Sequence, residues 1–258
     1  MAIRLQGSRF ELKYIIGEAT ARGIRNFAGG YLVADEHADP LRNNTYPVHS
    51  LYLDNAGLSL CYATIRGHKN RFKLRIRFYD NRPDSPVFFE IKRRVTDAIL
   101  KERAPVRREA ILPLLAGHWP RRDDLAEYSD RAMSALQRFC HLRTLVGAQG
   151  RAFVSYSREA YVSPGSNHIR VTFDRNLMGA HYQGAFDLPH LRERCHPQVG
   201  GVILELKYTE RFPSWMRDMV RMFDLERRSM AKYVVCVRTL GCVQVPVVLD
   251  YDYRDLAI

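Results

Sequence analysis

The sequence has no glycine-rich loop of the kind that holds nucleotide phosphates, because neither G-x-x-x-x-G-K-[ST] nor G-x-G-x-x-G occurs in its 258 residues. It also has no H-x-x-x-H helix pattern and no C-x-x-C pair, and its five cysteines are widely separated. These absences exclude a P-loop and a dinucleotide-binding fingerprint, and they argue against a zinc site or a disulfide framework. An odd number of dispersed cysteines is typical of reduced thiols in a cytosol-like compartment.

Long apolar runs are also missing: no segment reaches the length of a membrane span, and the N-terminus lacks the apolar core of a signal peptide. Acidic residues are few, because 28 Asp and Glu stand against 40 Lys and Arg and leave a net charge of +12. We therefore expect a cytoplasmic protein with an anionic partner. Nucleic acid, an acidic membrane surface and nucleotide phosphates all meet that requirement, so a peripheral membrane contact stays open.

Residues 70–79 contain the clearest pattern in the chain. The apolar residues Phe72, Leu74, Ile76 and Phe78 alternate there with the cations Arg71, Lys73, Arg75 and Arg77. A period of two predicts a strand with one apolar and one cationic face. Like charges on one face repel, so such a row is unfavourable unless solvent or an anion neutralises it. For this strand alone, an edge strand that carries charge to prevent aggregation is an equally good interpretation.

The same alternation recurs along the chain and predicts an α+β fold built on a closed sheet of about eight strands. The expected strands lie at 9–14, 50–54, 70–79, 89–94, 98–108, 151–161, 169–174 and 202–208. Amphipathic helices are predicted at 18–28, at 121–146 with a break near Ser129, at 213–224 and beyond Tyr233. Because these helices can cover apolar strand faces that would otherwise form an exposed patch, we expect a barrel with a charged interior wrapped by helices.

No linker divides the chain, which we interpret as a single domain over residues 1–258. The stretch 179–200 is the least periodic and is predicted to be a long loop that could gate a site. The tail 243–258 begins with alternating apolar residues, and it could add a strand or pack outside.

The charged faces contain a repeated pairing that suits phosphate chemistry. An E-x-K arrangement occurs three times, at Glu11–Lys13, Glu90–Lys92 and Glu205–Lys207. Arg75 and Arg77 share one strand face and can fork onto neighbouring phosphates. Carboxylates among cations fit a site where the cations bind phosphate oxygens and the acids bind a divalent ion.

A further phosphate-binding position is predicted at a helix start. Ser229 is expected to cap a helix that begins near Met230, which would place Lys232 in its first turn. A solvated lysine explains Lys232 equally well.

Eight short motifs in order resemble the VTC domain, the polyphosphate polymerase domain of the vacuolar transporter chaperone complex, in its stand-alone bacterial form. They are RFELKY at 9–14, SLYLD at 50–54, KLRIRFY at 73–79, FEIK at 89–92, YSR at 156–158, IRVTFD at 169–174, LELK at 204–207 and SMAKY at 229–233. This family belongs to the CYTH-like triphosphate tunnel metalloenzymes. The resemblance covers about residues 8–238 and leaves 239–258 as a C-terminal extension.

The resemblance implies an eight-stranded antiparallel tunnel in which the γ-phosphate of ATP is transferred to a polyphosphate chain with Mn²⁺ or Mg²⁺. The expected catalytic cations are Arg75, Arg77, Lys92, Arg158, Arg170 and Lys207. The expected substrate-binding residues are Lys13, Lys101, Tyr156, Ser229 and Lys232, among which Lys101 lies in a looser motif. Glu205 is expected to hold the metal.

Two other functions stay open at this stage. One is a hydrolase of triphosphate or nucleotides in the same tunnel. Hydrolases of the superfamily usually carry E-x-E-x-K on the first strand, and Arg9 stands here at the first acid, which weakens that alternative.

The other is a non-catalytic binder of polyphosphate or nucleic acid. No specific nucleic acid is expected, because the aromatic residues alternate to the face opposite the cations, whereas nucleic-acid binders usually interleave exposed aromatics with basic residues. The expected partners are ATP and polyphosphate, and a membrane protein that receives the product stays open.

Overall fold

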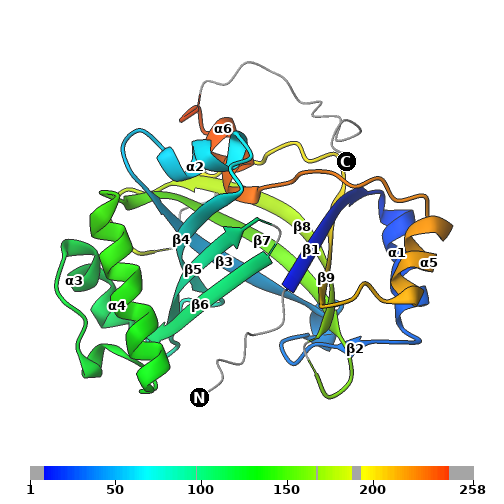
Figure 1. Ribbon diagram of the computed structural model, residues 1–258, viewed down its shortest axis with the longest axis horizontal. Coiled ribbons are helices and arrows are strands. Elements are labelled where there is room, and N and C mark those ends of the chain that lie inside the picture. Colours follow the sequence, from blue (N-terminus) through cyan, green and yellow to red (C-terminus); the bar gives the residue numbers. More distant parts are fainter. Residues whose placement is uncertain (1–8, 97, 167, 188–192, 244–258) are drawn as a thin grey trace.

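The computed structural model describes residues 9–96, 98–166, 168–187 and 193–243, and one antiparallel sheet dominates it (Figure 1). The strands are β1 (Arg9–Ile16), β2 (Val33–Ala34), β3 (Thr45–Asp54), β4 (Asn70–Phe78), β5 (Val87–Val95), β6 (Ala98–Val106), β7 (Gln149–Val162), β8 (Ile169–His181) and β9 (Val202–Thr209). The helices are α1 (Glu18–Ala28), α2 (Ser59–Ile65), α3 (Ile111–Ala116), α4 (Asp130–Leu145), α5 (Ser214–Met222) and α6 (Lys232–Thr239). All eight predicted strands are present in the sheet, and the predicted break near Ser129 is the N-cap of α4.

The strand order is β2-β7-β3-β4-β5-β6-β1-β9-β8, and β7 also pairs with β8. The sheet therefore has nine strands rather than the expected eight, because the short β2 adds to the edge of β7. The pairing of β7 with β8 curves the sheet back on itself and gives it a concave side.

The sheet is not fully closed into a barrel, which corrects the prediction of a closed sheet. Within the described ranges, β1 and β6 share one residue pair, Arg9 opposite Ile99, whereas the other neighbours in the ring share at least five. The two strands overlap only at their ends, because the described part of β1 runs from Arg9 away from the start of β6.

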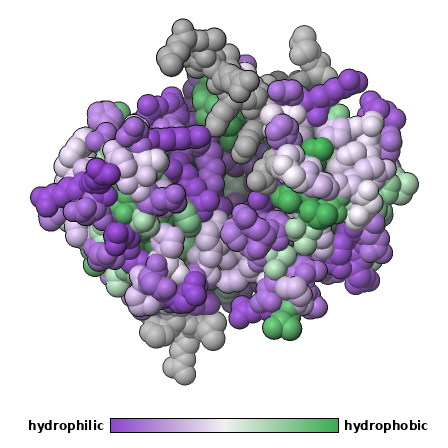
Figure 2. Space-filling view, turned by 90° about the horizontal axis from the view of Figure 1, so that it is seen from below, coloured by the Kyte–Doolittle hydropathy of each residue, from purple (hydrophilic) through white to green (hydrophobic). Residues whose placement is uncertain are grey.

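The charged strand faces point to the concave side, as the sequence predicted. Lys92 of β5 reaches Glu11 of β1 at 2.9 Å, and Arg158 of β7 reaches Glu205 of β9 at 3.2 Å, although neither pair of strands is adjacent. We call the charged side chains on this side the ionic interior: Glu11, Lys13, Lys73, Arg75, Arg77, Glu90, Lys92, Lys101, Arg103, Arg158, Asp174, Glu205 and Lys207 from the strands, with Lys232 from α6. Figure 2 shows a hollow near the middle of one face, bordered mainly by hydrophilic residues.

Two apolar clusters lie on the outer side of the sheet, under helices. One packs α4 against β5 and β6, where the ring centroids of Phe139 and Phe89 are 4.9 Å apart. The other packs α1 and α5 against β8 and β9 and contains Ile24, Met216 and Leu204. Figure 1 shows these helix groups on opposite flanks of the sheet. Each large apolar side chain buried here stabilises the fold by about 1.5–3 kcal/mol.

Helix α6 departs from the predicted outer position, because it packs against the concave side. The ring of Tyr233 stacks on Tyr52 with centroids 4.6 Å apart, and the Tyr52 hydroxyl accepts a hydrogen bond from Arg75 of the ionic interior. Gly179 permits this approach, since a Cβ there would lie 2.9 Å from the Cβ of Cys236. An apolar helix stripe can pack on either side of a sheet, so the stripe alone could not reveal which side α6 covers.

Other elements differ from the prediction in smaller ways. Helices α2 and α3 were not expected, and β8 continues to His181 into the stretch expected to be a loop. The predicted role of the tail 243–258 falls on residues outside the described ranges, apart from Val243. No helix of the described chain combines the length and apolar character needed to cross a membrane.

Candidate functional site

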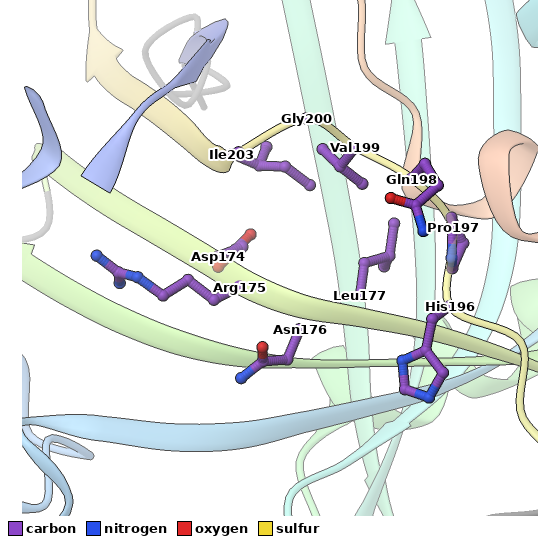
Figure 3. A pocket seen from close by; sticks show the side chains of 11 residues that line it. Asp174, Arg175, Asn176, Leu177, His196, Pro197, Gln198, Val199, Gly200 and Ile203 are labelled. Atoms are coloured by element: carbon purple, nitrogen blue, oxygen red, sulfur yellow. The ribbon is translucent and has the colours of Figure 1, made fainter. Parts of the chain in front are cut away.

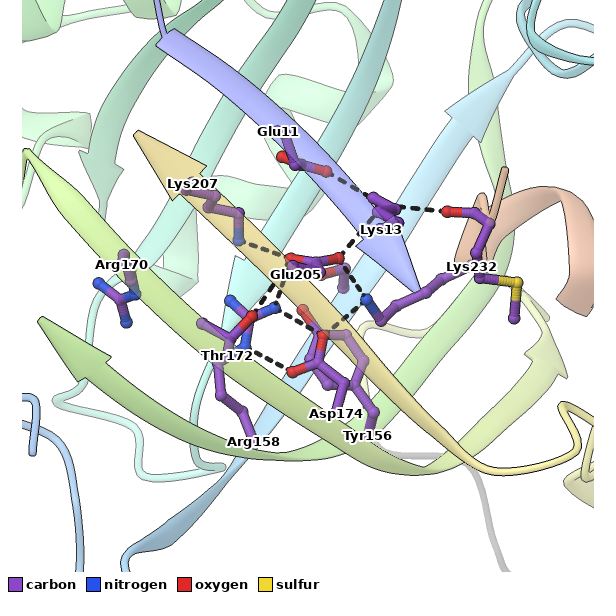
Figure 4. A network of polar contacts seen from close by, with 12 residues as sticks. Glu11, Lys13, Tyr156, Arg158, Arg170, Thr172, Asp174, Glu205, Lys207 and Lys232 are labelled. Carbon is purple, nitrogen blue, oxygen red and sulfur yellow. Dashed lines mark hydrogen bonds and ion pairs between the residues drawn. The ribbon is translucent and has the colours of Figure 1, made fainter. Parts of the chain in front are cut away.

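Glu205 of β9 is the centre of the ionic interior (Figure 4). Its carboxylate contacts four cations that come from four different elements. Their nitrogens lie 2.5 Å (Lys207), 2.7 Å (Lys232), 3.2 Å (Lys13) and 3.2 Å (Arg158) from its oxygens. The register places Lys13 of β1 directly opposite Glu205, and Arg158 of β7 reaches Glu205 across β8.

Asp174 of β8 completes this first group. The Arg158 guanidinium forks onto Asp174 with two hydrogen bonds of 2.7 Å, and Lys232 Nζ lies 2.6 Å from the same carboxylate. Arg158, Asp174 and Lys232 are each less than 10% exposed. A fork of this kind fixes the guanidinium plane, so Arg158 is oriented before any ligand arrives.

A second group surrounds Glu90 of β5, which is fully buried. Arg75 lies 2.7 Å from the Glu90 carboxylate, Lys101 lies 2.7 Å away and Arg103 lies 3.3 Å away. Arg75 also donates to the Tyr52 hydroxyl at 3.1 Å. The second group thus gathers three cations from β4 and β6 around one acid.

Glu11 of β1 connects the two sides of the interior. It lies 2.9 Å from Lys92 of β5 and 3.1 Å from Lys13 of its own strand. Lys13 also contacts Glu205 and donates to the backbone carbonyl of Met230. The polar contacts therefore run from β5 across the seam between β6 and β1 to β9.

Arg77 is held differently from its neighbours. It donates to the Ser50 hydroxyl at 3.3 Å and to the Tyr156 hydroxyl at 3.2 Å, and no carboxylate of the described chain pairs with it. The Tyr156 ring also lies under Lys232, whose Nζ is 4.8 Å from the ring centroid. Tyr156 thus orients two cations of the site.

Arg170 lies apart from the Glu205 group. Its guanidinium pairs with Asp35, in the segment after β2, and donates to the Tyr46 hydroxyl at 3.0 Å. The register of β8 nevertheless places it on the same face as Asp174, beside Lys207 of β9.

The prediction that Ser229 caps helix α6 is wrong, whereas its predicted part in substrate binding stays a prediction. Helix α6 begins at Lys232, its N-cap is Ala231, and no side chain caps it. Ser229 is exposed in the preceding segment. Lys232 does occupy the first turn, where it turns inward to Glu205 and Asp174.

The predicted charged residues other than Arg170 thus belong to the ionic interior, and Tyr156 contacts two of them. Arg170 lies on the same strand face but outside the Glu205 group. The roles of all these residues stay predictions. The sequence placed Glu90 and Asp174 only among the acids expected between the cations, and Arg103 and Tyr52 were not expected in the site. Strand alternation could have identified these residues, since each of them lies on the same face as a predicted site residue.

The carboxyls of the interior are ionised at neutral pH. Burial by itself would raise the pKa of Glu205, but Lys13, Lys207 and Lys232 hold it well below its ordinary value. The pKa of Glu90 is likewise held well below its ordinary value, against burial, by Arg75, Arg77 and Lys101. The carboxyl pKa values of Glu11 and Asp174 are lowered for the same reason.

Three lysines have pKa values close to neutrality. Burial lowers the pKa of Lys207 to about 8 although Glu205 opposes it, and burial lowers that of Lys101 to about 7 although Glu90 opposes it. Burial and nearby cations lower the pKa of Lys73 to about 7. An anion that enters the interior would raise all three pKa values.

The acids of the interior fit a divalent metal only in a restricted sense. Among the described residues, no group of three or more His, Cys, Asp or Glu side chains could hold an ion by itself. Magnesium is often held by one or two carboxylates together with substrate phosphates. Glu205 could contribute one carboxylate to such a shared site, provided that phosphate oxygens supply further ligands.

A separate pocket of about 230 Å³ lies beside the first group, between β8 and the segment 196–201 (Figure 3). Asp174 and Leu177 line it on the β8 side, and Gln198 and Val199 line it on the other. The carboxylate of Asp174 therefore borders this pocket as well as the ionic interior.

Residues 8–241, nearly the whole chain, match the family model described as the VTC domain. The chain belongs to the VTC domain family. No curated protein matches it. This VTC domain is similar to two solved structures, both at low identity. One, titled a putative adenylate cyclase from Bacillus halodurans, is 13% identical over 87% of this chain and 94% of that chain, with a TM-score of 0.48. The other, the PH1819 protein from Pyrococcus horikoshii OT3, is 12% identical over 89% and 98%, with a TM-score of 0.45.

Proposed function

We propose that this VTC domain is an ATP-dependent polyphosphate polymerase. The observation that carries the proposal is the charge of the ionic interior, in which ten cations face four carboxylates on the concave side of the sheet. Such an excess of basic side chains, several of them buried, favours binding of an anion of high charge density. A chain of phosphates supplies such charge along a line, which suits cations distributed over β1, β4, β5, β6, β7 and β9.

The cations would bind and orient the phosphates before reaction. Arg75 and Arg158 are already held in position by Glu90 and Asp174, so little reorganisation is needed when phosphate arrives. Arg77 has its guanidinium directed by two hydroxyls and is available to fork onto phosphate oxygens. Positioning of this kind is the main contribution that a protein makes to phosphoryl transfer.

The reaction needs no covalent group on the protein. A terminal oxygen of the polyphosphate chain would form a bond to the γ-phosphorus of ATP while the bond from that phosphorus to the β-bridging oxygen breaks, which releases ADP and lengthens the chain by one phosphate. Glu205 would hold Mn²⁺ or Mg²⁺ together with the phosphates, and such an ion supplies charge neutralisation at the phosphate oxygens. Lys207 and Lys232, both beside Glu205, would neutralise the remaining charge.

One observation favours a second candidate, hydrolysis of triphosphate. Helix α6 covers part of the concave side and contacts Tyr52 and Gly179. A lengthening polyphosphate chain would therefore have to pass α6 or leave the site on the side away from α6. A short substrate that is cleaved by water has no such requirement.

The decisive experiment is incubation of the protein with ATP and Mn²⁺, followed by separation of the products on a gel. Polyphosphate that lengthens with time supports the polymerase. Release of orthophosphate or pyrophosphate without chains supports the hydrolase. Binding of polyphosphate that weakens steeply with salt, without turnover of ATP, supports a non-catalytic binder.

A further inference from the structure

Lys73 is a member of the ionic interior to which the proposed reaction gives no role. It lies on β4 two residues before Arg75, so strand alternation places it on the same inner face. The residue directly opposite on β5 is another cation, Lys92. Like charges in direct opposition destabilise a sheet, so this pair calls for a neutralising group.

Lys92 has the Glu11 carboxylate, but on the described chain Lys73 forms neither a hydrogen bond nor an ion pair. The other lysines of the ionic interior all have acidic partners: Lys13 and Lys92 share Glu11, Lys101 pairs with Glu90, and Lys207 and Lys232 pair with Glu205. Lys73 is therefore the one lysine of this set without a carboxylate.

The groups that face Lys73 from each side explain why it lacks a partner. Lys13 of β1, Lys92 of β5 and Arg71 of its own strand are cations, and the Cys61 thiol of α2 affects Lys73 less than these three do. Asp54, at the end of β3, is already occupied. It accepts hydrogen bonds from the backbone N–H groups of Leu60 and Cys61 and from the Tyr233 hydroxyl.

We propose that Lys73 is a further phosphate-binding residue, which holds one phosphate group of the substrate together with Lys13 and Lys92 at the α2 end of the ionic interior. The three lysines come from β4, β1 and β5, and the carboxylate of Glu11 is the acid that Lys13 and Lys92 share. A phosphate seated among them supplies the negative charge that the protein itself lacks at this point. The proposal rests on the proposed function, because it extends the phosphate-binding surface of the same site.

A consequence of this position is proton uptake on binding. Burial, followed by repulsion from Lys13, Lys92 and Arg71, lowers the pKa of Lys73 to about 7, so at pH 8 most of the side chain is neutral in the free protein. A bound phosphate favours the charged form and raises this pKa. Lys73 then takes up a proton as the phosphate arrives, which makes binding stronger at lower pH.

The test is isothermal titration of inorganic triphosphate into the full chain at pH 8, in two buffers with different ionisation enthalpies, which counts the protons taken up. Lys73→Met is expected to bind triphosphate about tenfold more weakly, because one charge-assisted hydrogen bond is lost. Lys73→Arg is expected to keep the affinity while it takes up close to one proton fewer, since an arginine is already charged. The matched control is Lys69→Met, which removes an exposed lysine just before β4 and should bind like the wild type.

The outcomes separate this inference from the proposed function. Wild-type affinity in Lys73→Met, or a wild-type proton count in Lys73→Arg, overturns the role of Lys73 and leaves the proposed function standing. Failure of the wild type to bind triphosphate at all overturns both. If Lys73→Met does not fold, the proton count of Lys73→Arg against the wild type decides the question.

Discussion

Strand β4 has two faces of opposite character. Leu74, Ile76 and Phe78 contact the outer apolar cluster under α4, whereas Lys73, Arg75 and Arg77 face the ionic interior. Neighbouring residues of this strand therefore face either an apolar cluster or a charged interior.

The two faces contribute differently to the stability of the fold. Apolar burial on the outer face is favourable without any partner group. Burial of charges on the inner face costs several kcal/mol per ion, and ion pairing roughly offsets that cost without a large net gain. The outer face therefore stabilises the protein, and the inner face is best explained by a ligand that its charges bind.

The largest expected effect comes from breaking the inner face at its centre with Glu205→Gln. Four cations then lose their shared carboxylate, so the free energy of unfolding should fall by about 3–5 kcal/mol and turnover of ATP should be lost. Chemical denaturation and the gel assay measure these effects. Inorganic triphosphate should restore part of the stability, because its charges replace the lost one. Glu127→Gln, an exposed change of the same kind, is the control, and equal stability of the two variants would contradict the comparison.

Breaking the outer face should affect stability alone. Phe139→Ala removes a fully buried ring that packs on Phe89, and the free energy of unfolding should fall by about 3–5 kcal/mol. Turnover per folded molecule should not change at a temperature where the variant is folded. Leu145→Ala, on the exposed side of the same helix, should change neither quantity. A specific loss of turnover in Phe139→Ala would show that the two faces are not independent.

Arg77→Met separates the effect on turnover from the effect on stability. Arg77 is an inner-face cation, and its replacement leaves no carboxylate of the described chain without an ion-pair partner. We expect turnover to fall about 100-fold, while the free energy of unfolding changes by about 1 kcal/mol or less, because removal of a buried charge offsets the two lost hydrogen bonds. The exposed Arg131→Met on α4 is the matched control. A large loss of stability in Arg77→Met with unchanged turnover would assign a structural role to Arg77.

The last expected effect is a pH dependence of stability, for which the pKa shifts give the direction. The folded-state pKa values of Lys73, Lys101 and Lys207 are lowered to about 7, about 7 and about 8, so between about pH 7 and 8.5 the unfolded chain binds more protons than the folded protein. Stability must then rise with pH across this window. The melting temperature without phosphate should therefore increase from about pH 7 to about pH 8.5. Saturating triphosphate should remove the rise, and a fall in melting temperature without phosphate would contradict these pKa shifts.

The sequence determined the strands and the chemistry of their faces. A period of two over residues 70–79 is sufficient to place Leu74 and Arg75 on opposite faces, because side-chain alternation is a property of the extended backbone itself. For the same reason, Glu90 could be assigned to the same face as Lys92, and Lys207 to the same face as Glu205, before any strand pairing was known.

Only the tertiary structure decided how those faces meet. The seam between β1 and β6, the position of α6 on the concave side and the partners of Glu90 depend on register and packing between segments far apart in the chain. Ser229 illustrates the limit, since a serine suits a helix N-cap, yet α6 begins three residues later. Local sequence specifies which groups are available, whereas the distances between them follow from long-range contacts. Lys73, whose lack of a carboxylate partner no motif records, is known only from those contacts.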